Sequence, residues 1–347
     1  MQLLNTLYVT LPDSYLHLDN DTLRVEIERE TRLRVPLHHL SSVVCFGHVM
    51  VSPILMHRLA DEGKSLVLLD GNGRFKARLE GPVSGNVLLR QAQHRRLLDT
   101  ATSADFCLAV AKSCIAGKLK NCRQVLLRGA RESGRDDDNA ALAAVAEEFA
   151  RALARLEHAA DLDAVRGIEG DAAKRYFSVL KLIVRPEARA AFTMDGRTRR
   201  PPLDRMNALL SFLYSMLMND LRSAVESVGL DPQLGFLHAV RPGRAALALD
   251  LMEEFRPLLA DRLALTLINR RQINADDFVE RPGGAVVLKD DARKAVVTAY
   301  QERKQEAAMH PLLESTVSFG LVPLVQARLL ARSVRGDAEA YVPFTPK

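Results

Sequence analysis

The sequence is poor in cysteine and holds no two cysteines at a metal-binding or redox spacing. Its four cysteines form no Cys-x-x-Cys motif and lie apart from clustered histidines: they are Cys45, Cys107, Cys114 and Cys122. This pattern excludes the common zinc-binding and disulfide-exchange motifs. We expect the four thiols to be small, buried side chains in a reducing compartment.

The sequence also shows no long apolar run, no N-terminal pattern of a secretory signal peptide and no internal repeat. The longest uncharged stretches, 207–219 and 315–327, are shorter than the ~20 residues that a membrane-crossing helix needs. Residues 1–5 carry no basic region followed by an apolar core. We therefore predict a cytoplasmic protein that does not enter a membrane.

The remaining composition is that of an ordinary globular protein with a slight excess of positive charge. Of the 347 residues, 48% are hydrophobic and 26% are charged, which excludes a disordered chain or a coiled coil as the main architecture. The 48 basic and 43 acidic residues give a net charge of +5. A chain of this length favours two domains over one.

Residues 1–80 show the alternation of apolar and polar side chains that is typical of half-buried strands, for example between residues 22 and 28. Two segments rich in Asp, Asn and Gly, 19–21 and 70–73, are predicted to be hairpin turns. One helix is predicted over 52–61. The sequence thus predicts a small β-rich N-terminal domain.

Residues 81–86 contain Gly, Pro and Ser, break this alternation and are predicted to be a linker. From residue 87 the apolar positions recur every three or four residues, which is typical of helices packed on a core. Helices are predicted over 87–98, 103–128, 140–158, 171–184, 204–228, 245–255 and 293–308. We therefore predict an α+β protein with an all-α domain over 87–335 and a mobile tail over 336–347.

Three segments of the predicted helical domain place metal-binding side chains beside glycines and arginines. Glu169 lies between two glycines at the predicted start of a helix, and His238 follows a short apolar run. Asp250 and Glu253 are three residues apart and lie on one side of a helix. Each segment also has a simpler explanation. Glu169 could be a carboxylate that the helix dipole favours, and His238 could be a hydrogen-bonded core residue. Asp250 and Glu253 could form a solvated acidic face that pairs with Arg256.

Taken as one set, two carboxylates and an imidazole suit a hard or borderline divalent ion. The oxygen ligands favour Mg²⁺ or Mn²⁺, and the nitrogen favours Mn²⁺ somewhat. Such an ion stabilises charge on a phosphoryl oxygen and lowers the pKa of an attacking hydroxyl. For Asp250 and Glu253 taken alone, a solvated acidic face with an arginine partner and a metal site are equally good explanations.

Arginines near these segments indicate a phosphate-bearing substrate, because a planar guanidinium binds phosphate through two parallel hydrogen bonds. Further basic residues are spread over the domain, including Lys118, Arg123 and Arg128. A surface arginine is usually only solvated, so the prediction of nucleic acid depends on the combination with the acidic cluster. The predicted nucleic-acid-binding residues are Arg199, Arg200, Arg241, Arg244 and Arg256.

Four ordered motifs carry a resemblance to a known family. They are Gly-Ile-Glu-Gly at 167–170, Arg-Arg-Pro-Pro-Leu-Asp at 199–204, Gly-Leu-Asp-Pro…Gly-Phe-Leu-His at 229–238 and Leu-Ala-Leu-Asp-Leu-Met-Glu-Glu-Phe-Arg-Pro at 247–257. Together they resemble the spacer-acquisition integrase of CRISPR systems, the first CRISPR-associated core protein. The likeness runs from the N-terminal strands to the last helices and is strongest to the version found with subtype I-C systems.

The resemblance implies an N-terminal β-domain joined to a C-terminal α-helical domain, in agreement with the boundary predicted from periodicity. It also implies that Glu169, His238 and Glu253 hold the metal and are the catalytic residues. Asp250 would be an accessory ligand, and Arg256 would lie near the DNA phosphates.

The implied activity is that of a metal-dependent DNA integrase and endonuclease. The 3′-hydroxyl of a foreign DNA fragment attacks a phosphodiester at the edge of a CRISPR repeat, without ATP, and water can replace that hydroxyl. The implied partners are double-stranded DNA, a second copy of the chain bound through the β-domain, and a small ferredoxin-like CRISPR-associated protein. Two competing hypotheses are a catalytically idle DNA-holding subunit and a metal-dependent nuclease for branched DNA in repair.

Overall fold

The structure is a computed structural model, and it describes most of the chain: residues 5–71, 73, 75–81, 86–99 and 102–346. Within these residues, no helix combines the length and the apolar character that crossing a membrane would require.

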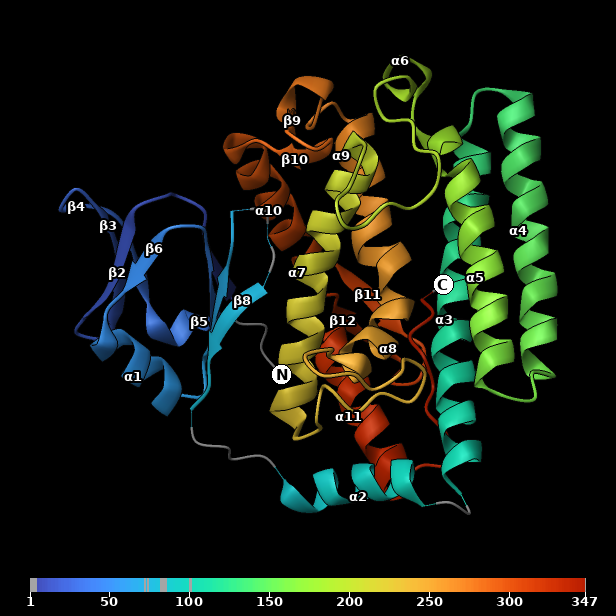
Figure 1. The fold of residues 1–347 in the computed structure, drawn as a ribbon, viewed down its shortest axis with the longest axis horizontal. Coiled ribbons are helices and arrows are strands. Elements are labelled where there is room, and N and C mark those ends of the chain that lie inside the picture. Colours follow the sequence, from blue (N-terminus) through green and yellow to red (C-terminus); the bar gives the residue numbers. More distant parts are fainter. Residues whose placement is uncertain (1–4, 72, 74, 82–85, 100–101, 347) are drawn as a thin grey trace. The chain divides into compact units, whose positions relative to one another are not determined.

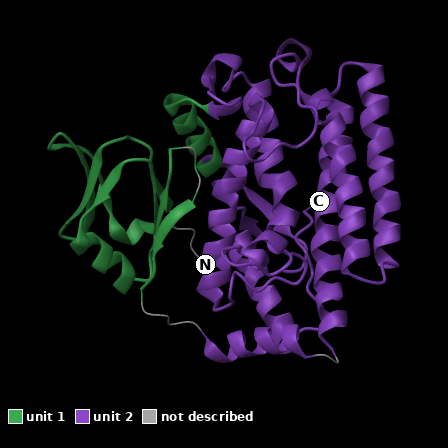
Figure 2. Ribbon diagram, viewed as in Figure 1, with its two compact units in different colours: residues 1–84, 288–301 green, residues 85–287, 302–347 purple. Residues whose placement is uncertain are grey.

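The chain divides into two compact units of different secondary structure (Figure 2). The first unit spans residues 1–84 and 288–301 and is rich in β-strands, whereas the second spans 85–287 and 302–347 and is mainly helical. The predicted α+β class, with a small β-rich region followed by a larger helical one, is therefore confirmed (Figure 1).

The β-rich unit contains two four-stranded sheets. Its strands are β1 (Asn5–Val9), β2 (Ser14–Asp19), β3 (Thr22–Ile27), β4 (Glu30–Pro36), β5 (Leu40–Phe46), β6 (Val49–Val51), β7 (Ser65–Leu69) and β8 (Phe75–Leu79). The first sheet has the order β1-β5-β7-β8, in which only the β7–β8 pair is antiparallel. The second has the order β4-β3-β2-β6, in which β2, β3 and β4 form an antiparallel meander.

The core of this unit follows from the local sequence. Leu23 and Val25, two residues apart on β3, are buried as the alternation predicts. Helix α1 (Pro53–Asp61) begins where the Ser52 hydroxyl accepts a hydrogen bond from the Leu55 N–H at 3.3 Å, which caps the helix. The helix predicted in this region is thus present.

The two predicted turns lie between paired strands. Asn20, between β2 and β3, has a φ of 53°, a left-handed conformation that asparagine tolerates. The second turn, 70–73, lies between β7 and β8, and its Asn72 is outside the described residues. The predicted linker, 81–86, is described only at its ends, since 82–85 also lie outside them.

One helix groups differently from the prediction. Helix α10 (Asp290–Gln305) is predicted within the helical domain, but residues 288–301 belong to the β-rich unit. There Gln301 Nε2 donates a hydrogen bond to the Thr6 carbonyl at 3.1 Å. The β-rich unit is therefore built from two separate parts of the chain, which periodicity does not reveal.

The helical unit is built around a long helix, α3. Its helices are α2 (Val87–Leu98), α3 (Ser103–Glu132), α4 (Asp136–Glu157), α5 (Leu162–Val179), α6 (Pro186–Arg189), α7 (Arg205–Val228), α8 (Ala246–Phe255), α9 (Arg262–Asn269) and α11 (Val322–Arg335). Two short two-stranded sheets accompany them: β9 (Phe278–Arg281) with β10 (Ala285–Leu288), and β11 (Ala307–His310) with β12 (Ser315–Ser318). Helix α3 packs against α4, α5 and α8, and α8 also packs against α7 (Figure 1).

Helix α5 begins at Leu162, not at Asp171 as the glycines suggest. The Asp161 side chain caps it by accepting a hydrogen bond from a backbone N–H at 2.8 Å. Gly167 and Gly170 therefore lie inside the helix, where an added Cβ would meet nothing within 4 Å. The cap and the packing of α5 on α3 and α4 outweigh the low helix propensity of glycine.

The C-terminal tail corrects another prediction. Residues 336–347 are predicted to be mobile, yet Tyr341 and Phe344 are 3% and 0% exposed. The Tyr341 hydroxyl donates to one carboxylate oxygen of Glu254 at 2.6 Å, and the Phe344 N–H donates to the other at 2.7 Å. Buried aromatic rings and these hydrogen bonds hold the tail on the helical unit.

Candidate active site

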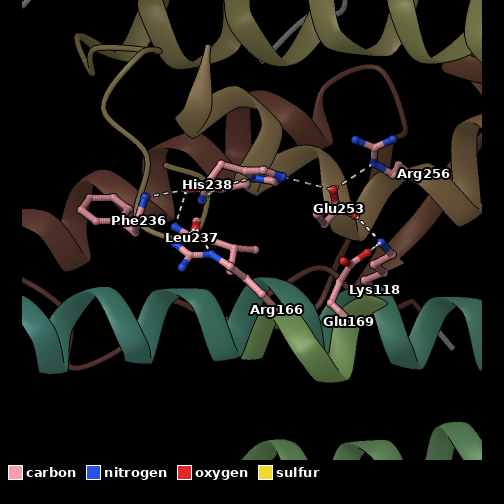
Figure 3. Close-up of polar contacts among 9 residues, drawn as sticks. Lys118, Arg166, Glu169, Phe236, Leu237, His238, Glu253 and Arg256 are labelled. Carbon is pink, nitrogen blue, oxygen red and sulfur yellow. Dashed lines mark hydrogen bonds and ion pairs between the residues drawn. The ribbon is translucent and has the colours of Figure 1, made fainter. Parts of the chain in front are cut away.

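Two carboxylates from different helices meet at one ammonium group (Figure 3). Glu169 lies on α5, Glu253 on α8 and Lys118 on α3. Lys118 Nζ lies 2.6 Å from Glu253 Oε2 and also forms a salt bridge with Glu169 Oε1. Two of the predicted ligands therefore share a cation, although they are far apart in the sequence.

His238 lies on the loop that precedes α8 and approaches the carboxylate of Glu253. Its Nε2 lies 4.0 Å from Glu253 Oε1, and its Nδ1 lies 2.6 Å from Asp250 Oδ1. A carboxylate at Nδ1 favours a proton on that nitrogen and leaves a lone pair on Nε2. Metal-binding histidines commonly have such a carboxylate behind them.

Asp250 accepts hydrogen bonds through both of its carboxylate oxygens. Its Oδ2 accepts hydrogen bonds from the N–H groups of Phe236 at 2.6 Å and Leu237 at 3.0 Å. Its Oδ1 accepts from the N–H of His238 at 2.9 Å and also contacts the ring. Asp250 therefore holds the loop that carries His238, and its role as an accessory metal ligand stays a prediction.

The loop around His238 is held closely against two helices. A Cβ on Gly235 would lie 2.7 Å from the Ala246 carbonyl carbon and 2.8 Å from Asp250 Oδ2, so a larger residue would push the loop away from α8. From α5, Arg166 donates two hydrogen bonds to the Leu237 carbonyl, at 3.1 and 2.6 Å (Figure 3). These contacts set the direction in which the imidazole points.

Arg256 contacts Glu253 as well. It begins a π-helical turn, Arg256–Asp261, that follows α8 directly. Its Nε lies 3.2 Å from Glu253 Oε1, and its guanidinium lies over the Tyr214 ring, 4.7 Å from the centroid. With a side chain only 11% exposed, Arg256 is engaged mainly within the protein.

These contacts keep Glu253 ionised in spite of its burial. Burial by itself would raise its pKa, but Arg256, Lys118 and His238 together lower the pKa of this carboxyl to about 2. Burial lowers the pKa of Lys118, and the charges of Glu253 and Glu169 outweigh this and raise it. The site therefore contains buried carboxylate charge balanced by cationic side chains.

The donor set fits a divalent cation. Glu253 Oε2 is buried and, apart from its ion pair with Lys118, makes no hydrogen bond within the described residues. Carboxylate oxygens and an imidazole nitrogen are ligands that Mg²⁺ and Mn²⁺ accept. In the described part of the chain, no three acidic, histidine or cysteine side chains are arranged to bind an ion as they stand.

A further acid is buried next to Arg256. The Tyr214 hydroxyl donates a hydrogen bond to Asp261 Oδ1 at 2.6 Å. Burial raises the pKa of Asp261 to about 6, against the opposing effects of Tyr214 and Arg256.

We expect Asp261→Asn to change how stability depends on pH. The pKa of Asp261 is about 6 in the folded protein, against an ordinary value of 3.8, so the folded state holds this proton more tightly. That stabilisation is complete below about pH 4 and is lost as the pH rises through 6. The melting temperature of the variant minus that of the wild type should therefore increase between these values. Circular dichroism melts measure the difference, and a constant one would contradict the prediction.

The other four arginines predicted to bind nucleic acid lie at or near the surface. Arg199 lines a small pocket of about 30 Å³ together with Lys118. Arg200 and Arg241 are exposed, and Arg244 is half-buried. Their contact with DNA stays a prediction.

The sequence does not reveal Lys118, Arg166 and Tyr214 as members of the site. Lys118 is one of many basic residues on helices, and Tyr214 lies in an apolar run. Arg166 directly precedes the Gly-Ile-Glu-Gly motif, and this proximity is the one local signal. The partners of all three are distant in the chain, so no periodicity indicates them.

Comparison with known proteins extends over nearly the whole chain. The model of the family described as CRISPR associated protein Cas1 matches residues 7–302. Curated relatives include CRISPR-associated endonuclease Cas1 1 of Moorella thermoacetica, which is 56% identical over 342 residues. CRISPR-associated endonuclease Cas1 2 of Rhodospirillum rubrum is 51% identical over 352 residues. Each match covers 99% of this chain and 98% of the relative.

Solved structures share the fold. The Cas6-RT-Cas1–Cas2 complex contains a chain that matches with a TM-score of 0.81 at 23% identity, over 98% of this chain and 36% of that one. A casposase bound to its integration product also matches with a TM-score of 0.81, at 21% identity, over 99% of this chain and 93% of that one.

Proposed function

The chain belongs to the Cas1 family of CRISPR-associated proteins, and we propose that it is a metal-dependent DNA endonuclease and integrase that inserts DNA fragments at a CRISPR repeat. The observation that carries this proposal is that Glu169 and Glu253 meet at the Lys118 ammonium, while His238 Nε2 lies 4.0 Å from Glu253 Oε1. The two curated relatives of nearly equal length are endonucleases, which supports hydrolysis of DNA as one of its reactions.

In this proposal Glu169, His238 and Glu253 hold Mg²⁺ or Mn²⁺. When bound, the ion supplies positive charge to the phosphoryl oxygen and lowers the pKa of the attacking hydroxyl. Asp250 keeps a proton on His238 Nδ1, so that Nε2 stays free to bind. Arg256 keeps Glu253 ionised and limits its motion through the ion pair between them.

The proposed integration exchanges one phosphodiester for another. The 3′-hydroxyl oxygen of the fragment forms a bond to a phosphorus atom of the repeat, and the bond from that phosphorus to the repeat's 3′-oxygen breaks. The proton of the attacking hydroxyl passes to solvent, and the leaving oxygen takes one up. Because the number of ester bonds is unchanged, no ATP is consumed, and water as the nucleophile gives hydrolysis instead.

We propose DNA and two protein partners on the basis of the family and the four motifs. Arg199, Arg200, Arg241 and Arg244 would contact DNA phosphates at the surface. A second copy of the chain would bind through the β-rich unit, and a small ferredoxin-like CRISPR-associated protein would complete the integration complex. The match to subtype I-C stays a prediction.

Removal of divalent metal is expected to stop both reactions. The assay combines the chain and its small partner with a labelled duplex that ends in 3′-hydroxyls and a plasmid that carries a CRISPR repeat. With Mg²⁺ or Mn²⁺, label should join the plasmid at the repeat. With EDTA, joining and hydrolysis should cease, whereas retardation of the DNA in a native gel should persist, because phosphate contacts by arginines need no metal.

Other outcomes would favour the competing hypotheses. Joining that continues in EDTA would contradict the metal site. Binding of DNA without any cleavage or joining in either metal would favour a DNA-holding subunit. Cleavage of a Holliday-type junction with no joining at the repeat would favour a nuclease of repair.

A further inference from the structure

A second pocket, with a volume of about 540 Å³, lies at the end of α3 and shares no residue with the small pocket at Lys118. Its walls come from four parts of the helical unit: the last turns of α3, the start of α4, residues 182–189 and α9. In Figure 1 the end of α3 and the beginning of α4 lie at the same end of the unit as α6. We refer to this cavity as the arginine pocket.

Positive charge exceeds negative charge in the arginine pocket. Glu132 and Asp138 are its acidic residues, and each already has an arginine partner. Arg128 Nε lies 2.7 Å from Glu132 Oε1, and Arg189 Nη2 lies 2.9 Å from Asp138 Oδ2. The six arginines that line the pocket are Arg128, Arg135, Arg185, Arg189, Arg262 and Arg270. Six guanidinium groups against two carboxylates leave four positive charges without a neutralising acid in the lining.

Arg262 differs from the arginines that pair with Glu132 and Asp138. It is half-buried, and within the described residues its guanidinium makes no hydrogen bond and no ion pair. Burial lowers the pKa of Arg262, and the like charges of Arg303 and Arg128 lower it further, while Glu306 and Glu132 oppose them. A partly desolvated cation without a partner is unfavourable, and an anion in the pocket would remove that cost.

Apolar side chains also line the pocket, and we refer to them as its floor. Val125 and Leu265 are buried, and Ile183 packs so closely on α3 that a Cβ on Gly129 would lie 2.7 Å from its Cγ1. Asn269, the last residue of α9, connects this helix to residues 183–185. Its Nδ2 donates a hydrogen bond to the Ile183 carbonyl at 3.0 Å, and its Oδ1 accepts one from the Arg185 N–H. Guanidinium groups beside an apolar floor suit a ligand that has both a phosphate and an apolar part.

We propose that the arginine pocket binds a nucleotide through its phosphate, either as a free nucleotide or as part of a DNA strand. The guanidinium of Arg262 supplies the central contact, Arg185 and Arg270 approach from the surface, and the base lies against the apolar floor. This site is separate from the carboxylates at Lys118 and does not depend on the function proposed for them.

Binding of ADP and of a 5′-phosphorylated oligothymidylate, each titrated into the full chain by calorimetry, tests the proposal. EDTA is kept in the buffer so that no ion at Glu253 contributes. Arg262→Gln should weaken binding by about 10-fold or more, because a charge-assisted hydrogen bond is lost. Arg270→Gln, at an exposed residue whose loss does not threaten folding, should weaken it about 3-fold or more. Arg151→Gln, an exposed arginine of α4 outside the pocket, is the matched control and should leave binding unchanged.

Comparison of the ligands shows whether the phosphate is needed for binding and whether it comes from a free nucleotide or from DNA. Adenosine, which lacks phosphate, should bind far more weakly than ADP. Tighter binding of the oligonucleotide that both pocket variants weaken assigns DNA as the source, and equal or tighter binding of ADP that both variants weaken assigns a free nucleotide. The proposal fails if neither ligand binds at millimolar concentration, if adenosine binds as well as ADP, or if both pocket variants bind like the wild type.

Discussion

Replacing Glu253 by glutamine is expected to lower the rate of DNA strand transfer by at least ~10²-fold while the protein stays folded. Glutamine has nearly the same shape but carries no negative charge, so it cannot balance a divalent ion. The carboxylate it replaces is buried, contacts Lys118 and Arg256, and lies 4.0 Å from the His238 ring. Asp250, one turn earlier on α8, is hydrogen-bonded to the loop around His238.

Controls separate this loss from a loss of structure. Glu147→Gln, at an exposed glutamate of α4 that pairs with Arg123, should retain the wild-type rate. Glu169→Gln changes the more exposed of the two carboxylates and should also lower the rate strongly, with less effect on folding. Strand transfer by a folded Glu253→Gln protein at the wild-type rate would refute the assignment of the site. Circular dichroism and melting temperature establish that each variant is folded.

Replacing Phe344 by alanine is expected to destabilise the helical unit by about 3–5 kcal/mol, as large-to-small changes at buried aromatic positions do. Phe344 is fully buried in the C-terminal tail. Its ring stacks on Phe255 with centroids 6.2 Å apart, and it lies 6.1 Å from Phe319 and 5.4 Å from the His310 ring. Alanine removes these contacts and leaves a cavity that rigid neighbours cannot fill.

The loss of packing at Phe344 should also affect α8, the helix that carries Glu253. Phe255 is the last residue of α8, and Glu254 on the same helix accepts hydrogen bonds from the Phe344 N–H and the Tyr341 hydroxyl. Urea unfolding measures the change in the free energy of unfolding. Val342→Ala, at a 42% exposed residue of the same tail, is the control and should change this free energy by less than about 0.5 kcal/mol. Equal stability of Phe344→Ala and the wild type would contradict the packing described for the tail.

Local sequence accounts for much of the fold. Helix α2 has the predicted bounds, and α7 starts and ends within one residue of the prediction. Both are predictable because a helix and its caps depend on residues only a few positions apart in the sequence. The buried alternation of β3 follows from the same local signal. The sequence predicts the start of α5 nine residues too late, at Asp171 instead of Leu162, because two glycines weaken the helical pattern. The packing of α5 on α3 and α4 shows that the helix continues through them.

The sequence by itself determined the fold class, the position of the β-rich region and, through four motifs, which glutamates and which histidine to consider. Only the tertiary structure decided that Lys118 lies between Glu169 and Glu253, that Asp250 holds the His238 loop and that the tail is buried. The physical reason is range. Helices and strands form from contacts between residues a few positions apart, whereas a charge pair or a buried ring depends on partners that the packing of distant helices brings together.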